Sequence, residues 1–213
     1  MPAAGRFISF EGGEGAGKTT QIERLARRLR EAGAEVVTTR EPGGTPGAEA
    51  IRALLVKGET TRWDGRTEAL LMNAARADHV AKVILPALDR GAWVLSDRYG
   101  HSTLAYQGFA RGMDTSELLN LHNIATGGLW PAQTFLLDLP VEAGLARAIG
   151  RGDKEARFEG EARAFHQRVR DGFLTMARDD ESMVTIDAAE DADAVAAAIW
   201  AAVEPTLSPP GTT

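Results

Sequence analysis

The segment that most restricts the fold of this chain is an apolar run that breaks into a glycine-rich loop. Residues 7–21 read FISFEGGEGAGKTTQ, and apolar residues at helical spacing follow. The letters fit the pattern G-x-x-x-x-G-K-[ST], and a strand before the loop with a helix after it is the context that this pattern requires. We therefore predict a loop that binds the phosphates of ATP. The expected ATP-binding residues are Gly12, Gly13, Glu14, Gly15, Ala16, Gly17, Lys18, Thr19 and Thr20.

This loop predicts a nucleotide and a metal ion but not a reaction. Glycines let backbone N–H groups curve around phosphate oxygens, and the helix N-terminus adds positive potential. Lys18 is expected to reach the β- and γ-phosphates, and Thr19 to ligate Mg²⁺ through its hydroxyl. Asp97, which ends the apolar run AWVLSD, resembles the acidic strand end that holds the same ion. A nucleotide-dependent switch, a motor ATPase and a small-molecule kinase all begin with such a loop.

Five segments rich in β-forming residues, separated by stretches with helical spacing, predict the fold. Continuous apolar strands that alternate with helices are typical of a parallel sheet covered on both faces. We expect a three-layer α/β/α fold with five parallel strands, formed as a single domain across residues 1–213 with a frayed tail at 205–213. Ligands of such sheets bind beyond the carboxyl ends of the strands. The expected strands are Arg6–Phe10, Glu35–Thr39, Ala92–Ser96, Thr134–Leu139 and Met183–Ile186.

The charge and composition of the chain argue against several classes of binding partner. The chain carries 24 Lys and Arg against 30 Asp and Glu, so no overall positive field attracts nucleic acid or an anionic membrane. The apolar run at residues 194–203 is too short to cross a bilayer. Cysteine is absent, which excludes disulfides and thiolate metal sites. We expect a cytoplasmic protein with small-molecule partners, no nucleic acid and no membrane, in which local arginines hold any anionic substrate.

Arginines at two predicted strand ends indicate a second anion site. Arg40 begins the turn segment REPGGT after the second strand, and Arg98 follows Asp97 after the third. Taken singly, each arginine also fits a solvated surface charge. A pair on the ligand-binding edge, beside an acidic residue, favours a second phosphorylated molecule opposite the ATP. Met72 and Arg76 are four residues apart on a helical stretch and so share one face.

Five segments together resemble the bacterial thymidylate kinases (dTMP kinases), a family of P-loop nucleoside-monophosphate kinases. They are FEGGEGAGKTT, TREPGGT, AARADHV, SDRYGHSTLAYQGFARGMD and RFEGEARAFHQRVRDGF, and the resemblance runs from residue 6 to residue 187. It implies transfer of the γ-phosphoryl group of ATP·Mg²⁺ to dTMP, giving dTDP and ADP on the way to dTTP. It also implies a homodimer, with part of the apolar stretch 69–88 at the interface, although core packing explains that stretch nearly as well.

The resemblance assigns expected roles to individual residues. Arg40 and Arg98 would hold the dTMP phosphate, and Glu14 would lie near the sugar and that phosphate. The thymine edge would form hydrogen bonds with Arg76, Thr103 and Gln107. Tyr106 would crowd the 2′ side of the sugar, and Met72 takes the stacking position on the base. The expected dTMP-binding residues are Glu14, Arg40, Met72, Arg76, Arg98, Thr103, Tyr106 and Gln107.

Two positions depart from the pattern of the family. The residue that stacks on thymine is typically aromatic, and here it is Met72. A thioether over a ring contributes about 0.3–1.5 kcal/mol, so we expect binding with an altered tolerance of base shape. His101 stands where many members have Asp. We interpret it as a surface or helix-end residue, because an ionised acceptor phosphate needs little proton abstraction.

A segment with arginines and glycines follows the fourth predicted strand and suggests a lid. Gly150 and Gly152 flank Arg151, and the expected lid covers about residues 147–160. Alone, the segment equally fits a charged helix end in solvent. Some thymidylate kinases carry an arginine in the phosphate loop at the position of Gly15, and others supply arginines from the lid, so the resemblance implies the second type. The expected catalytic residues are Lys18, Arg98, Arg151, Arg157 and Arg147.

The alternatives are a kinase for another nucleoside monophosphate and a nucleotide switch. A GTPase switch would carry a guanine-reading N-K-x-D segment, which the sequence lacks. The stripe formed by Phe165, Val169 and Phe173 is interpreted as core rather than site.

Overall fold

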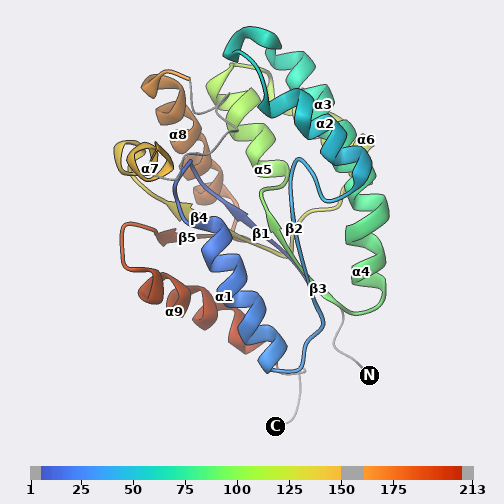
Figure 1. The fold of residues 1–213 in the computed structure, drawn as a ribbon, viewed down its shortest axis with the longest axis vertical. Coiled ribbons are helices and arrows are strands. Elements are labelled where there is room, and N and C mark those ends of the chain that lie inside the picture. Colours follow the sequence, from blue (N-terminus) through green and yellow to red (C-terminus); the bar gives the residue numbers. More distant parts are fainter. Residues whose placement is uncertain (1–5, 150–160, 208–213) are drawn as a thin grey trace.

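The protein is a three-layer α/β/α sandwich around one parallel sheet, as the sequence predicts (Figure 1). The computed structural model describes residues 6–149 and 161–207. Its five strands pair in the order β2-β3-β1-β4-β5, all parallel. Each predicted strand lies within one residue of an observed one. The strands are β1 (Phe7–Glu11), β2 (Val36–Arg40), β3 (Trp93–Asp97), β4 (Gln133–Asp138) and β5 (Met183–Asp187).

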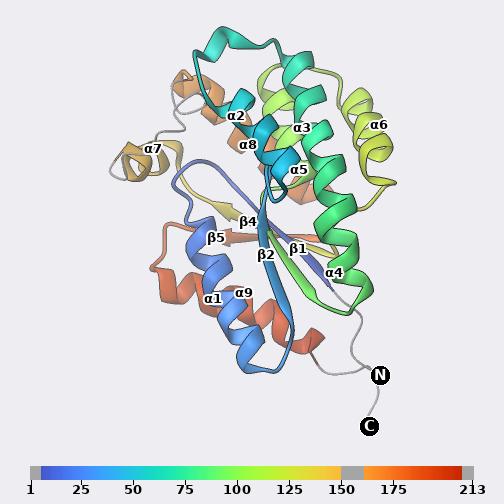
Figure 2. The same cartoon turned by 45° about the vertical axis from the view of Figure 1, so that its right-hand side comes forward.

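Helices cover both faces of this sheet (Figures 1 and 2). One face carries α1 and α9, and the other carries the stretch Val80–Ile84, α4, α8 and the helical segment around Tyr106. Two π-helical stretches extend α3 and α5, at Val80–Ile84 and Leu104–Ala110. The helices are α1 (Lys18–Glu31), α2 (Pro46–Val56), α3 (Gly65–His79), α4 (Leu85–Asp89), α5 (Gly100–Thr103), α6 (Thr115–Thr126), α7 (Val141–Ile149), α8 (Arg163–Asp179) and α9 (Ala192–Val203).

The core consists of the helix stripes that the apolar spacing predicts. The buried residues of α1 pack on β1, β4 and α9. On the opposite face, Phe165, Val169 and Phe173 of α8 are buried against Tyr106 and Leu136. Strand β1 is buried along its whole length, which is typical of a central parallel strand with both faces covered. The stripe on α8 is therefore core, as expected.

The register of the strands gathers the functional segments at one edge. Phe10 of β1 lies opposite Asp97 of β3, and Arg40 of β2 lies opposite the same aspartate. The phosphate loop, Arg40 and Arg98 thus leave the sheet side by side at its carboxyl edge. This is the place where ligands of open α/β sheets bind.

The prediction of a tail that frays from Pro205 is wrong at its start. Residues Glu204–Thr206 form a 3₁₀ turn, and Leu207 packs against the core between α1 and α9. Proline suits this turn because its fixed φ fits a first helical position. Residues 208–213 lie outside the described part of the chain.

Candidate active site

A cleft of about 930 Å³ opens at the carboxyl edge of the sheet. It is bounded by the phosphate loop, the ends of β2 and β3, and one face of α3. Almost all residues predicted to bind nucleotides meet there. Those that line it are Glu14, Gly15, Ala16, Gly17, Lys18, Thr19, Thr20, Arg40, Met72, Arg76, Asp97, Arg98, Thr103, Tyr106 and Gln107.

The phosphate loop has the backbone that its glycines predict. Gly12, Gly15 and Gly17 have positive φ angles of 136°, 69° and 88°, and Gly17 begins α1. The Nζ atom of Lys18 lies over the loop and donates to the carbonyls of Gly12 and Gly13 at 3.3 and 3.0 Å. Burial, followed by the charge of Arg98, lowers the pKa of Lys18. An anion bound in this loop would relieve that charge repulsion.

Gly15 has a packing reason as well as a conformational one. A Cβ atom at this position would overlap the carbonyl oxygen of Gly144 in α7, and a Cβ atom on Gly144 would overlap the carbonyl oxygen of Glu14. The loop and α7 therefore approach each other backbone to backbone. This contact leaves no room at position 15 for the arginine that some family members carry.

Thr19 and Asp97 meet at the start of α1. The Thr19 hydroxyl donates to Oδ2 of Asp97 at 3.1 Å. Oxygen ligands of this kind suit Mg²⁺, which keeps several waters and phosphate oxygens in its shell. No cluster of three or more His, Cys, Asp or Glu side chains forms a separate metal site within residues 6–149 and 161–207. Two protein oxygens beside the phosphate loop fit a metal ion that arrives with a nucleotide.

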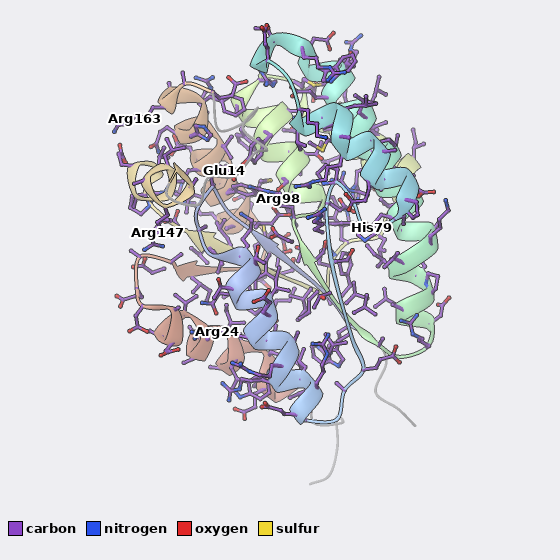
Figure 3. The ribbon with its side chains drawn as sticks, viewed as in Figure 1. Glu14, Arg24, His79, Arg98, Arg147 and Arg163 are labelled. Carbon is purple, nitrogen blue, oxygen red and sulfur yellow. The ribbon has the colours of Figure 1, made fainter. Side chains whose placement is uncertain are left out.

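Arg98 joins the phosphate loop to the helix that follows β3. Its Nη1 donates to the Gly12 carbonyl at 3.0 Å and to the Ser102 hydroxyl at 3.1 Å. Its Nη2 donates to Glu14 at 3.0 Å and to the Tyr106 hydroxyl at 3.1 Å. The residue has a φ of 70°, a left-handed backbone that is uncommon outside glycine. This turn aims the guanidinium into the cleft next to Glu14 (Figure 3).

The electrostatics of this group keep Glu14 ionised. Burial alone would raise the pKa of Glu14, but the charges of Arg98 and Lys18 and the hydrogen bond from Tyr106 outweigh burial and lower it to about 2. For Arg98, burial works against the charged form, yet Tyr106 and Glu14 raise its pKa. Burial also raises the pKa of Tyr106. The cleft thus holds a fixed pair of opposite charges where the loop meets Arg98.

Glu11 of β1 stabilises the turn that follows β3, and the sequence did not predict this role. Its carboxylate is buried and accepts the Tyr99 N–H at 2.8 Å and the Ser102 hydroxyl at 2.6 Å. Ser102 in turn accepts from Arg98. Burial, opposed by the Ser102 hydrogen bond and by Arg98, raises the pKa of Glu11 to about 7. The residue lies in the quoted loop segment, but no local pattern shows that its partners are on the strand-three turn.

Arg76 lies at the other end of the cleft with its guanidinium fixed. Its Nε donates to Glu41 at 2.7 Å, and its Nη2 donates to the Tyr99 carbonyl and the Thr103 hydroxyl at 3.1 and 3.0 Å. Its Nη1 donates to Asn73 at 3.0 Å. Four of its five N–H groups therefore have partners among the described residues, and one on Nη1 has none there and is left for the cleft.

Glu41 is the second residue that sequence reasoning missed. It is 5% exposed, and its other oxygen bonds Nδ1 of His79 at 2.9 Å. Nε2 of His79 in turn bonds the hydroxyl of Thr39 at 2.7 Å. The carboxylate thus ties the end of β2 to α3. The acidic letter inside TREPGGT was the available signal.

Arg40 and Arg52 line the cleft near its mouth. Arg40 is half exposed and pairs with Glu49, with 3.1 Å between Nη2 and Oε2. Arg52 of α2, which was not predicted, donates to the Pro42 carbonyl at 2.7 Å. Together with Arg76 and Arg98 they bring four guanidinium groups to one cleft, and this concentration of positive charge suits an anionic ligand.

The expectation that His101 is a surface residue is wrong. It lies in the first turn of α5, as a helix-end residue would, but it is buried, and its ring lies 4.7 Å from that of Trp130. Its Nε2 lies 3.6 Å from Oδ2 of Asp180. Burial lowers its pKa to about 4, against the opposing effect of Asp180. His101 does not line the cleft.

The predicted lid residues divide into two groups. Arg147 lies in α7 and donates from Nη1 to the Ala188 carbonyl at 3.2 Å, away from the cleft (Figure 3). The helical turn directs this position toward the segment after β5, so the structure does not bring it together with Lys18 and Arg98. Arg151, Arg157 and the predicted lid from residue 150 to residue 160 lie outside the described residues.

Comparison with known proteins gives a consistent result. The sequence model of the thymidylate kinase family matches residues 10–199. A thymidylate kinase of Caulobacter vibrioides is 56% identical over 92% of this chain and 94% of its own length. One of Magnetococcus marinus is 52% identical over 94% and 96%. The crystal structure of thymidylate kinase from Ehrlichia chaffeensis superposes with a TM-score of 0.75 at 33% identity, covering 93% of this chain and 99% of that one.

These matches cover nearly the full length of the chain, including the phosphate loop and the strand-end arginines of the cleft. The chain belongs to the thymidylate kinase family.

Proposed function

We propose that this protein transfers the γ-phosphoryl group of ATP to the phosphate of dTMP, giving ADP and dTDP. An oxygen of the dTMP phosphate bonds to the γ-phosphorus, and the bond from that phosphorus to the β–γ bridging oxygen breaks. The observation that carries the proposal is the position of Arg98, which reaches from the acceptor side of the cleft to the phosphate loop at Gly12 and Glu14. Such a group can hold two phosphates close together and in line.

The donor is assigned to the phosphate loop. Backbone N–H groups at the start of α1 would bind the ATP phosphates, and Lys18 would turn from its loop carbonyls to the β- and γ-phosphates. Thr19 and Asp97 would hold Mg²⁺, whose charge neutralises the phosphate oxygens when it is bound. These residues bind and orient the donor, and phosphoryl transfer requires little more.

The acceptor is assigned to the rest of the cleft. Arg40 and Arg98 would bind the dTMP phosphate, and the free N–H on Nη1 of Arg76 would donate to the base. Thr103 fixes the Arg76 guanidinium and lies beside it, and Met72 offers a thioether to the face of the ring.

Tyr106 and Glu14 would limit the sugar on its 2′ side. The proposed roles of Arg151 and Arg157 in charge stabilisation remain predictions from the sequence.

One experiment separates this function from its alternatives. ADP formation from ATP·Mg²⁺ is measured with dTMP, dUMP, dCMP, dGMP and UMP offered singly. Strong turnover with dTMP and weak turnover with the others is expected. Preference for a different monophosphate would indicate another kinase of the same fold, and slow hydrolysis that ignores every acceptor would indicate a nucleotide switch.

We propose that the protein acts as a homodimer through a surface on three adjacent helices. Large apolar side chains are exposed there on α2, α3 and α6, with Leu70 53% and Ile124 83% exposed. Exposed apolar groups gathered in this way are typical of an interface. Light scattering should give a dimer for the wild type and a monomer for Leu70→Glu. Ala201→Glu, which alters an exposed residue of α9 on the opposite face of the sheet, serves as the control, and a monomeric wild type would contradict the proposal.

We propose a cytoplasmic location for this reaction, because the proposed substrates are free nucleotides. Within residues 6–149 and 161–207, no helix is long and apolar enough to cross a membrane.

A further inference from the structure

A buried carboxylate next to the base end of the cleft fixes the orientation of Gln107. Glu68 lies on α3 four residues before Met72 and eight before Arg76, so the three share the helix face toward the cleft. Unlike the other two, Glu68 does not line the cleft, and its side chain has no solvent exposure. It lies directly behind Gln107.

The hydrogen bonds of Glu68 identify which end of the Gln107 amide faces it. Arg111 donates to Glu68 from Nε at 2.8 Å and from Nη2 at 3.1 Å. A carboxylate held by such a fork is ionised and can only accept hydrogen bonds. Gln107 must therefore turn its NH₂ group toward Glu68, and Nε2 lies 3.0 Å from Oε2.

The carbonyl end of Gln107 is consequently an unfilled acceptor. Gln107 is fully buried and lines the cleft, and its Oε1 has no hydrogen-bond partner among the described residues. A buried acceptor without a donor is destabilising, so a ligand with an N–H at this point gains affinity and one with a second acceptor loses it.

We propose that Glu68 is a specificity-determining positioning residue. It holds the Gln107 carbonyl toward the cleft and so selects bases with a hydrogen on N3, which thymine and uracil have and cytosine lacks. This inference rests on the proposed function, because it requires that dTMP binds in the cleft with its base against Gln107. Arg111 is itself fixed by Glu161 at 2.7 Å and by the Phe165 ring, 5.0 Å from its guanidinium, so the carboxylate has little freedom to turn.

The test is Glu68→Met, which keeps the length of the side chain and removes the acceptor that holds the Gln107 NH₂ group. Without this acceptor, the Gln107 amide is free to turn its NH₂ group into the cleft, where it would donate to N3 of cytosine. The ratio of kcat/KM for dTMP to that for dCMP should fall by about tenfold or more. The ratio of dTMP to dUMP should stay within about twofold, because both bases carry the N3 hydrogen.

Two further variants keep the proposal falsifiable if Glu68→Met folds poorly. Glu161→Gln weakens the support of Arg111 but leaves Glu68 an acceptor, so both ratios should be unchanged. Gln107→Met removes the acceptor and should weaken dTMP and dUMP while sparing dCMP. Equal losses on all three substrates in Glu68→Met, or an unchanged dTMP to dCMP ratio in Gln107→Met, would overturn the proposal. A wild type that does not prefer dTMP would instead refute the proposed function.

Discussion

The two ends of the cleft hold their ligand-facing groups by different means. At the loop end, residues 12–20, the groups are backbone amides, one lysine and one hydroxyl supplied by a single continuous segment. At the α3 end, the groups are the side chains of Arg76 and Gln107, and buried carboxylates at Glu41 and Glu68 hold them. The loop end is therefore encoded locally, whereas the α3 end depends on pairs that only the fold brings together.

The largest expected effect comes from Lys18→Ala at the loop end. Lys18 is proposed to stabilise charge on the transferring phosphoryl group, so its loss should lower kcat on the order of 1,000-fold, which corresponds to about 4 kcal/mol. The Kd of dTMP, measured by calorimetry, should change little because the α3 end is untouched. A variant that lost dTMP affinity but kept kcat would break the division between the two ends.

Next in size is the loss of stability in Glu41→Gln at the α3 end. The change removes the negative charge between Arg76 and His79 and leaves a buried guanidinium without its counter-ion. Breaking a buried pair in this way should cost about 3 kcal/mol of unfolding free energy, measured with urea. Glu49→Gln is the matched control, because its partner Arg40 is half exposed and such a pair contributes less than about 1 kcal/mol. Equal losses would show that burial does not distinguish the two.

The same division explains what could be predicted from the sequence. The five strands are continuous apolar runs that end at turn residues, and the phosphate loop is one contiguous pattern, so both were found within a residue or two. Glu11, Glu41 and Glu68 were missed because a glutamate in isolation reads as an exposed charge. Their partners, Tyr99, Arg76 and Arg111, are distant in the chain.

The prediction that His101 lies at the surface is wrong for the same reason, because the residues that cover it are distant in the chain. Nothing near it in sequence indicates that Trp130 and Asp180 cover it in the fold. The arginines of the lid were predicted from glycine spacing, and Arg147 shows the limit of that signal. Helical phase, rather than proximity in sequence, decides which way its side chain points.

A smaller effect is expected for Gly15→Ala, which tests the contact between the loop and α7. The added methyl group would overlap the Gly144 carbonyl, and the positive φ disfavours alanine. Together these should cost about 2 kcal/mol and raise the KM for ATP. Gly13→Ala is the control, since a Cβ atom there meets nothing within 4 Å. If both variants bind ATP equally, the close approach to α7 does not constrain the loop.

The smallest expected effect is a pH dependence of stability from His101. Its pKa falls from 6.5 to about 4 on folding, chiefly because of burial, with Asp180 opposing the change and Arg76 adding to it. Between these values the unfolded chain binds a proton at His101 that the folded chain does not bind. Stability is therefore fully present above pH 6.5 and is lost as the pH falls toward 4.

The measurement is the unfolding free energy at pH 7 and pH 5 for the wild type and His101→Leu. His101 should account for a loss of roughly 1–2 kcal/mol over this interval, and the variant should show a loss smaller by that amount. His122, whose pKa burial also lowers to about 4, remains in both proteins, and the variant removes only the small contribution of His101 to that shift. Parallel pH profiles for the two proteins would show that His101 is not held neutral by the fold. Since His101 lies outside the cleft, the KM for dTMP at pH 7 should be the same in both.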